Sequence, residues 1–291
     1  MSGFSRWFDD TSGVAPGEMY RVAVSGVVWS ARTPYQHVLI LETPLYGRVL
    51  VLDDAIQSSE RDEHIYHEAL VHPALIAAPD LRRVLIIGGG EGALLREVLK
   101  YRTVEKVTMI DLDEQLVRAC REYLPSYPAG AFDDPRAEVI FGDGVSYLRA
   151  SPETFDCIFV DVNDSEPDSI SGNLYTPEFY ALARARLSAR GMLAAPAATP
   201  HPLHLDLLAQ LAHSARQVFA RLNLYVCYVP VLGSPWAFLC ASSHSAARAL
   251  SAAEVDRRLA DRVTGPLRFY DGETHVSMFA LPRYLREMLD G

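Results

Sequence analysis

The segment Val84-Leu-Ile-Ile-Gly-Gly-Gly-Glu-Gly92 decides the fold of this chain. Its four leading residues form a continuous apolar run, which is typical of a strand buried on both faces of a sheet. Gly88, Gly90 and Gly92 follow in a G-x-G-x-G pattern, where glycine lets the backbone turn sharply and approach a ligand closely. Residues 93–101 have a helical pattern, so the segment predicts a strand, a glycine turn and a helix.

Strands and helices alternate along the rest of the chain. We therefore predict an α/β fold, a Rossmann-like, methyltransferase-type, doubly wound sheet of seven strands that is mainly parallel and ends in a hairpin. The predicted strands are residues 84–87, 106–110, 137–141, 155–160, 191–195, 224–231 and 236–242, and the predicted helices are 60–77, 93–101, 114–123 and 204–221.

The N-terminal segment has a different texture, with alternating apolar and polar residues rich in aromatic and β-branched side chains. Residues 19–24, 35–41 and 48–52 are predicted to be strands of a small antiparallel sheet. We therefore divide the chain into an N-terminal β domain, residues 1–60, and a Rossmann-like catalytic domain, residues 61–291.

Acidic residues at the strand ends predict a nucleoside site. Asp111 and Asp113 end the second strand of the large sheet, where a carboxylate can accept hydrogen bonds from both ribose hydroxyls. Asp143-Gly144 closes the third strand, where a carboxylate can accept from an adenine amine. Glu91 lies inside the glycine turn and would repel a pyrophosphate but suit a cation. These features favour an adenosyl sulfonium compound over a dinucleotide.

The fourth strand ends in Asp161-Val-Asn-Asp164, at the sheet edge where open α/β sheets bind ligands. An amine that attacks a carbon beside a sulfonium must first lose a proton, because its pKa is about 10. Asp161 and Asp164 could take that proton and hold further ammonium groups. The alternative for both residues is a structural role in capping a turn of the loop that follows.

Two histidines superficially suggest a zinc site, but their spacing argues against one. His67 and His72 stand in an H-E-x-x-x-H pattern, and residues five apart lie about 140° apart around a helix. We therefore predict no metal. The four cysteines form no C-x-x-C pair, and Cys157 and Cys227 lie in apolar runs, which indicates buried free thiols.

Charge and hydropathy restrict the partners. The net charge of −10 disfavours nucleic acid and anionic membranes and favours a small cationic substrate. No apolar run approaches the roughly 20 residues needed to span a bilayer, and residues 1–16 do not form a signal peptide. We expect a cytoplasmic protein.

Several motifs, in order, resemble the polyamine aminopropyltransferase (spermidine/thermospermine synthase) family. The resemblance covers about residues 18–288. The motifs are residues 57–75, 88–92, 111–113, 130–136, 143, 161–164, 269–275 and 278–282. The resemblance implies transfer of an aminopropyl group from decarboxylated S-adenosylmethionine, a co-substrate, to a polyamine such as putrescine, agmatine or spermidine, with release of methylthioadenosine. It also implies a homodimer or homotetramer built through the N-terminal domain, with no metal and no tightly bound cofactor.

The resemblance assigns roles on the donor side. Gln36 and His67 would bind the donor, Glu91 its aminopropyl ammonium, Asp111 the ribose and Asp143 the adenine. The backbone around the nucleoside would come from Gly88, Gly90, Gly92 and Gly144.

On the acceptor side, Asp161 would be the general base and Asp164 would bind the acceptor amine. The acceptor channel would be lined by Gln57, Tyr66, Tyr228 and Trp236.

Three departures from the family pattern lie on the acceptor side. Ser165 replaces a usual proline, Ala195-Pro196-Ala197 stands where a glutamine is common, and Val226 takes a position where a tyrosine is frequent. Two other functions therefore stay open from the sequence. One is a methyltransferase that uses S-adenosylmethionine, and the other is a diverged family member with a different acceptor or with a binding role only.

Overall fold

A computed structural model describes residues 6–11, 17–162, 172–244 and 246–290. Within these residues the strands form three sheets, of which the largest has seven strands in the order β12-β13-β11-β10-β7-β8-β9. Its strands are β7 (Arg83–Gly88), β8 (Lys106–Asp111), β9 (Ala137–Phe141), β10 (Phe155–Asp161), β11 (Leu187–Pro196), β12 (Arg221–Val229) and β13 (Ser234–Ser242). Five neighbouring strands, β11 to β9 in this order, pair in parallel, and β12 and β13 form an antiparallel hairpin beside β11. The predicted fold class is confirmed.

Helices cover both faces of the large sheet. The side chains of each strand alternate between two cores, one on each face, so both faces are apolar and are buried by helices. Ile86 packs into the core shared with α1 (Glu63–Ala77) and α2 (Ala93–Leu99), whereas Ile87 packs into the core shared with α5 (Pro177–Arg186) and α6 (Asp206–Arg216). The helices in chain order are α1 (Glu63–Ala77), α2 (Ala93–Leu99), α3 (Glu114–Tyr123), α4 (Gly144–Ala150), α5 (Pro177–Arg186), α6 (Asp206–Arg216), α7 (Ala252–Arg262), α8 (Gly272–Met278) and α9 (Arg283–Asp290). Among the described residues, no helix is long and apolar enough to cross a membrane.

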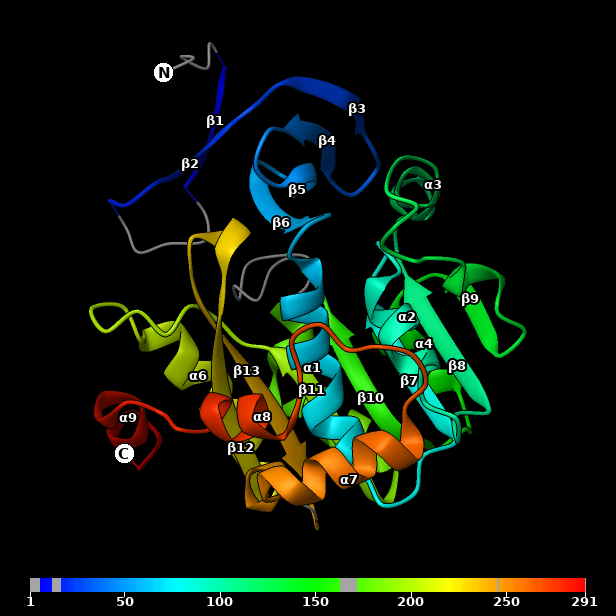
Figure 1. The fold of residues 1–291 in the computed structure, drawn as a ribbon. Coiled ribbons are helices and arrows are strands. Elements are labelled where there is room, and N and C mark those ends of the chain that lie inside the picture. The colour runs from blue at the N-terminus through cyan, green and yellow to red at the C-terminus, as the bar shows by residue number, and fades with distance from the viewer. Residues whose placement is uncertain (1–5, 12–16, 163–171, 245, 291) are drawn as a thin grey trace.

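The N-terminal strands lie at one end of the large sheet, blue at the top of Figure 1. β1 (Trp7–Asp10) pairs with β2 (Tyr20–Ala23), and a four-stranded antiparallel sheet contains β3 (Gly26–Arg32), β4 (His37–Thr43), β5 (Gly47–Leu52) and β6 (Ala55–Ser59). Ile40 of β4 and Leu50 of β5 pack against Cys120 of α3 in a third core. This small sheet therefore packs on α3, the helix that follows β8 in the chain.

Some strands were not predicted from the sequence, and one predicted helix boundary was wrong, for local reasons. Strands β1, β3 and β6 were not predicted, because each is short or has partly exposed residues on both faces. Helix α6 ends at Arg216 rather than at residue 221, because Arg221 already pairs with Ser242 in the hairpin. All four cysteines are buried free thiols, as predicted for Cys157 and Cys227.

The centre of the large sheet should carry much of the stability. Phe159 of β10 is fully buried between β7 and β11, so replacing it with alanine leaves a cavity in the core. We expect Phe159→Ala to lower the free energy of unfolding by about 3–5 kcal/mol in denaturant titrations. Leu203→Ala is the control, because Leu203 is 89% exposed and its loss should cost less than about 0.5 kcal/mol. Equal losses for both variants would contradict this packing.

Candidate active site

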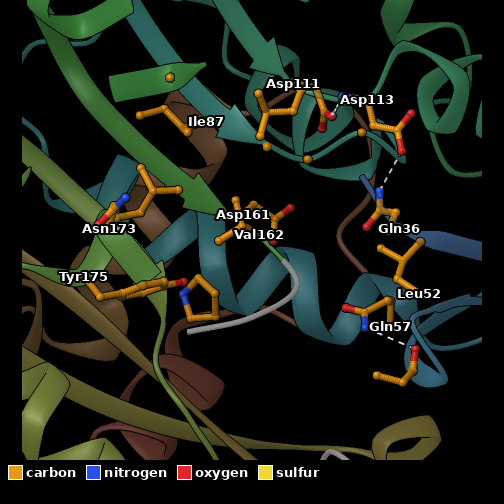
Figure 2. Close-up of a pocket in the computed structure, with 18 of the residues that line it drawn as sticks. Gln36, Leu52, Gln57, Ile87, Asp111, Asp113, Asp161, Val162, Asn173 and Tyr175 are labelled. Atoms are coloured by element: carbon orange, nitrogen blue, oxygen red, sulfur yellow. Dashed lines mark hydrogen bonds between the residues drawn. The ribbon is translucent and has the colours of Figure 1, made fainter. Parts of the chain in front are cut away.

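A cavity of about 1240 Å³ lies at the carboxyl ends of β7, β8 and β10 (Figure 2). Carboxyl ends of parallel strands meet at one edge of the sheet, which is where this fold binds ligands. Most of the predicted site residues line the cavity, including Gln36, Gln57, Tyr66, Gly88, Gly90, Glu91, Asp111, Asp113, Asp143, Gly144, Asp161 and Trp236.

The glycine turn is pressed against the end of β10. Gly88 has a φ of +85°, and a Cβ atom there would lie 2.1 Å from the backbone oxygen of Asp161. The Gly89 amide donates to that same oxygen at 2.8 Å. Any larger residue at position 88 would therefore separate the turn from Asp161, so glycine is required by both the dihedral angle and the space.

The two acidic residues at the end of β8, Asp111 and Asp113, have different roles. Asp113 caps α3, since its Oδ1 accepts from the amides of Gln115 and Leu116 at 3.1 Å each. Its Oδ2 accepts from the hydroxyl of Thr33 at 2.7 Å and from the amide group of Gln36 at 3.0 Å. Asp113 therefore fixes the start of the helix and ties Thr33 and Gln36, between β3 and β4, to the cavity wall.

Asp111 keeps more of its capacity for a ligand. Its Oδ1 accepts from the amide of Asp113 at 2.8 Å, and its side chain lies in the cavity wall. Burial raises the pKa of Asp111 to about 6, and the nearby charge of Asp113 adds to that rise, whereas hydrogen bonds from the amides of Asp113 and Gly90 oppose it. A hydroxyl pair that donates to this carboxylate would stabilise its charged form.

Asp143 and Gly144 lie at the start of α4. The Oδ1 atom of Asp143 accepts from the Ser146 amide at 2.7 Å and caps the helix, while the side chain stays exposed on the cavity wall. A Cβ atom on Gly144 would lie 2.5 Å from Cγ2 of Ile87, so glycine lets the helix approach β7. Both residues line the cavity, and their contact with an adenine stays a prediction.

Glu91 is held from two sides at the mouth of the glycine turn. The Nε2 atom of His67 lies 2.6 Å from Oε1 of Glu91, and the Ser58 hydroxyl donates to Oε2 at 2.5 Å. The Nδ1 atom of His67 lies 2.9 Å from Oε2 of Glu63. Burial alone would lower the pKa of His67, but the charge of Glu91 and the bonds to both carboxylates outweigh it and hold this pKa well above its usual value.

Asp161 ends β10 beside this charged group. The Tyr66 hydroxyl donates to Oδ1 of Asp161 at 3.3 Å. Burial raises the pKa of Asp161 to about 6, while the positive charge of His67 lowers it and the negative charge of Glu91 raises it. Asp161 is therefore a stronger base than an exposed aspartate, although it is still charged at neutral pH.

Not every predicted residue reaches the cavity. His67 is buried behind Glu91 and does not line the cavity, so its contact with the site runs through that carboxylate. Gly92 starts α2 in a left-handed conformation and also lies outside the lining. Tyr228 is 57% exposed on β12, away from the cavity wall. Asp164 and the departure at Ser165 lie outside the described residues.

The cavity wall also contains residues that the sequence analysis did not predict. Asn173 and Tyr175 come from the turn Gly172–Tyr175 and line the same cavity as Asp161 and Val162 (Figure 2). The following Thr176-Pro177 pair is a recognisable helix start, because Thr176 caps the Phe179 amide. That signal marks the start of α5, which the sequence analysis missed, but the position of the turn against the cavity depends on tertiary packing.

The two histidines of the H-E-x-x-x-H pattern face different partners. His67 contacts Glu63 and Glu91, whereas Nδ1 of His72 lies 3.0 Å from the Tyr101 hydroxyl and its Nε2 lies 3.2 Å from Glu97. Within the described part of the chain, no group of three or more histidine, cysteine, aspartate or glutamate residues is placed to hold a metal ion.

Comparison with known proteins gives the family of this architecture and site. The family description "Spermine/spermidine synthase domain" matches residues 63–251, and "Spermidine synthase tetramerisation domain" matches residues 6–60. The chain belongs to the spermine/spermidine synthase family. These matches confirm the resemblance on which the predicted enzyme class, aminopropyl transfer, was based.

Curated relatives match almost the whole chain. The polyamine aminopropyltransferase of Sulfurisphaera tokodaii is 39% identical over 275 residues, which cover 94% of this chain and 91% of the relative. Polyamine aminopropyltransferase 2 of Pseudomonas aeruginosa is 41% identical over 276 residues, which cover 94% of this chain and 79% of the relative. These names favour an aminopropyltransferase over the methyltransferase alternative.

Solved structures of the spermine/spermidine synthase family share the fold. A crystal structure of spermidine synthase in complex with the transition-state analogue AdoDATO has a TM-score of 0.89 and 30% identity, and the match covers 98% of this chain and 95% of that one. Spermidine synthase from Thermotoga maritima has a TM-score of 0.87, also with 30% identity, over 98% of this chain and 94% of that one.

The role of the glycine turn in ligand binding can be tested without replacing a charged residue. A Cβ atom on Gly90 would lie 2.8 Å from Oδ2 of Asp111, so Gly90→Ala should displace this carboxylate. We expect calorimetry to show at least about tenfold weaker binding of methylthioadenosine, the loss of roughly one good hydrogen bond. Gly26→Ala is the control, since nothing lies within 4 Å of a Cβ atom there. Unchanged binding by Gly90→Ala would contradict the placement of the nucleoside beside Asp111.

Proposed function

We propose that this chain transfers the aminopropyl group of decarboxylated S-adenosylmethionine to a primary amine of a polyamine, with methylthioadenosine as the second product. The observation that carries the proposal is the joint placement of Glu91, Asp111 and Asp161 around one cavity at the glycine turn. The donor carries a sulfonium and an ammonium group, and a cluster of carboxylates suits both charges.

The donor would lie along the carboxyl ends of β7, β8 and β9. Asp111 would accept from the ribose hydroxyls, and Asp143 would accept from the adenine amine at the start of α4. Glu91, which is held by His67 and Ser58, would bind the aminopropyl ammonium. Ordinary S-adenosylmethionine has a carboxylate on the same chain, which the Glu91 carboxylate would repel.

Asp161 would act as the general base. The acceptor amine forms a bond to the aminopropyl carbon next to sulfur, and the carbon–sulfur bond breaks with its electron pair remaining on sulfur. The proton of the acceptor nitrogen passes to Asp161, whose pKa of about 6 makes it a better proton acceptor than an ordinary aspartate. The Tyr66 hydroxyl would keep the carboxylate in place through its bond to Oδ1.

The acceptor would enter along a mostly apolar wall next to Asp161. Pro196, Ala197, Leu232 and Trp236 line this part of the cavity and could contact the methylene groups of a polyamine. Gln57 also lines the cavity, and its Nε2 donates to the Ala55 oxygen at 3.1 Å. Putrescine, agmatine and spermidine are the candidate acceptors.

We also propose a homodimer or homotetramer that assembles through the N-terminal domain, residues 1–60. The match of residues 6–60 to the tetramerisation domain supports this assembly. The proposed compartment is the cytoplasm, which agrees with the buried free thiols.

An acceptor screen tests the proposed reaction. Purified protein is incubated with decarboxylated S-adenosylmethionine and putrescine, agmatine or spermidine, and methylthioadenosine is measured by chromatography. We expect release with at least one of these amines. Failure to release methylthioadenosine with all three acceptors would overturn the proposal, and methyl transfer from S-adenosylmethionine would favour the methyltransferase alternative.

Replacing the base should affect turnover more than donor binding. We expect Asp161→Asn to lower kcat by about 10²–10⁴-fold, because the amide cannot take the proton of the acceptor. The dissociation constant of the donor should change by less than about fivefold. Asp80→Asn is the control, since its ion pair with Arg190 is exposed. Turnover above one tenth of the native rate in Asp161→Asn would rule out Asp161 as the base.

The pH profile should reveal the raised pKa of this group. Because Asp161 must be charged to accept a proton, kcat/KM for the donor should fall as the pH drops through about 6. Asp111, also with a pKa of about 6, should steepen the same limb. An acid limb centred near pH 4, the ordinary range of aspartate, would show that neither carboxylate is perturbed in this way.

A further inference from the structure

Arg96 lies outside the active-site cavity and is not among the residues that line it. It belongs to α2, and its side chain is only 16% exposed. Its guanidinium binds Glu63 through two parallel contacts, Nη1 to Oε1 at 3.0 Å and Nη2 to Oε2 at 2.9 Å. Such a bidentate pair fixes the plane of the carboxylate as well as its position.

The carboxylate that Arg96 holds is the one that contacts His67. Oε2 of Glu63 lies 2.9 Å from Nη2 of Arg96 and also 2.9 Å from Nδ1 of His67. Nε2 of the same histidine lies 2.6 Å from Oε1 of Glu91, which does line the cavity. A continuous path of three ion pairs therefore runs from α2 through α1 to the glycine turn.

The charges along this path alternate. Arg96 and protonated His67 carry two positive charges, and Glu63 and Glu91 carry two negative charges, so the four groups balance within a buried region. Without Arg96, the uncompensated Glu63 would compete with Glu91 for the charge and the orientation of His67. Buried groups respond strongly to such a loss, because little water is available to compensate.

We propose that Arg96 is a positioning residue for Glu91, acting through Glu63 and His67, and thereby for the ammonium end of the donor. This inference rests on the proposed function. It deepens that function by assigning donor recognition to a residue outside the cavity. Arg96 does not touch the substrates and takes no part in the bond changes.

A purely structural role is the alternative, since Arg96 has three further contacts. Its Nη1 donates to the backbone oxygens of Tyr127 at 2.6 Å and Ser126 at 3.4 Å, and its Nε donates to Oε1 of Glu97 at 2.9 Å. If Arg96 acted only by holding these groups in place, its loss would distort the whole nucleoside site. The two roles therefore differ in which ligands they affect.

Calorimetry with two nucleosides separates these roles. Decarboxylated S-adenosylmethionine carries the aminopropyl ammonium, whereas methylthioadenosine has the same adenosyl group without it. We expect Arg96→Met to weaken binding of the first by about tenfold and of the second by less than about twofold. Arg82→Met is the matched control, because its ion pair with Glu105 is exposed and distant from the path, and it should change neither constant.

A double variant tests the same role if Arg96→Met alone is poorly folded. In Arg96→Met combined with Glu63→Gln, both outer charges are absent and His67 remains paired with Glu91. We expect donor binding in this double variant to recover to within about threefold of the native protein. Arg96→Lys should give an intermediate loss, since an ammonium keeps the charge but not the bidentate contact.

Three results would overturn the inference: equal weakening of both nucleosides in Arg96→Met, unchanged donor binding in a folded Arg96→Met protein, or a double variant no better than the single one. Turnover of the native protein is measured in the same preparations. Native protein that binds the donor but releases no methylthioadenosine with any acceptor would refute the proposed function. The binding comparison would still decide the role of Arg96.

Discussion

The active site depends on the close approach of two parallel strand ends. Because Gly88 of β7 lies directly against the backbone oxygen of Asp161 at the end of β10, the turn proposed to bind the nucleoside and the proposed base form one unit. The Gly89 amide closes this junction with a hydrogen bond of 2.8 Å to that oxygen. Alternation along β7 then sends Ile86 and Ile87 into opposite cores, which fixes the junction within the sheet.

The balance of charges around this junction explains how the site can be stable without a bound cation and still bind one. Glu91 already has a positive neighbour in His67, but burial raises the pKa of both Asp111 and Asp161 to about 6. Each of these carboxyl groups has a higher pKa in the folded protein than its unfolded pKa of 3.8, so its protonated form favours folding. This contribution is fully present below pH 3.8 and is lost as the pH rises through about 6. At neutral pH the site therefore holds negative charge at some cost in stability, which a bound cationic donor would offset.

The sequence predicts the elements whose signal is local. The glycine turn, the apolar strands on either side of it and the helix caps are set by a few adjacent residues, and the large sheet was predicted correctly as seven strands, mainly parallel, that end in a hairpin. The N-terminal strands β1, β3 and β6 were missed, because pairing with neighbours outweighs their weak patterns. Helix α5 was missed although Thr176-Pro177 marks its start.

The candidate site was predictable only in part, because side-chain direction depends on tertiary contacts. Carboxylates at strand ends reach the cavity as expected, since the sheet brings these ends together. His67 and Tyr228 do not line it: the former turns toward Glu63 and Glu91, and the latter points out from β12. The sequence separates Arg96 from Glu63 by 33 positions, and only the packing of α2 on α1 shows that they pair.

The placement of donor and acceptor can be tested by a crystal structure of the Asp161→Asn variant with decarboxylated S-adenosylmethionine and a polyamine. We expect the Glu91 carboxylate to lie within about 3.2 Å of the aminopropyl nitrogen, and the side chain at position 161 to lie within the same distance of the acceptor nitrogen. A donor bound with its aminopropyl chain directed away from Glu91, or an acceptor remote from position 161, would contradict this placement.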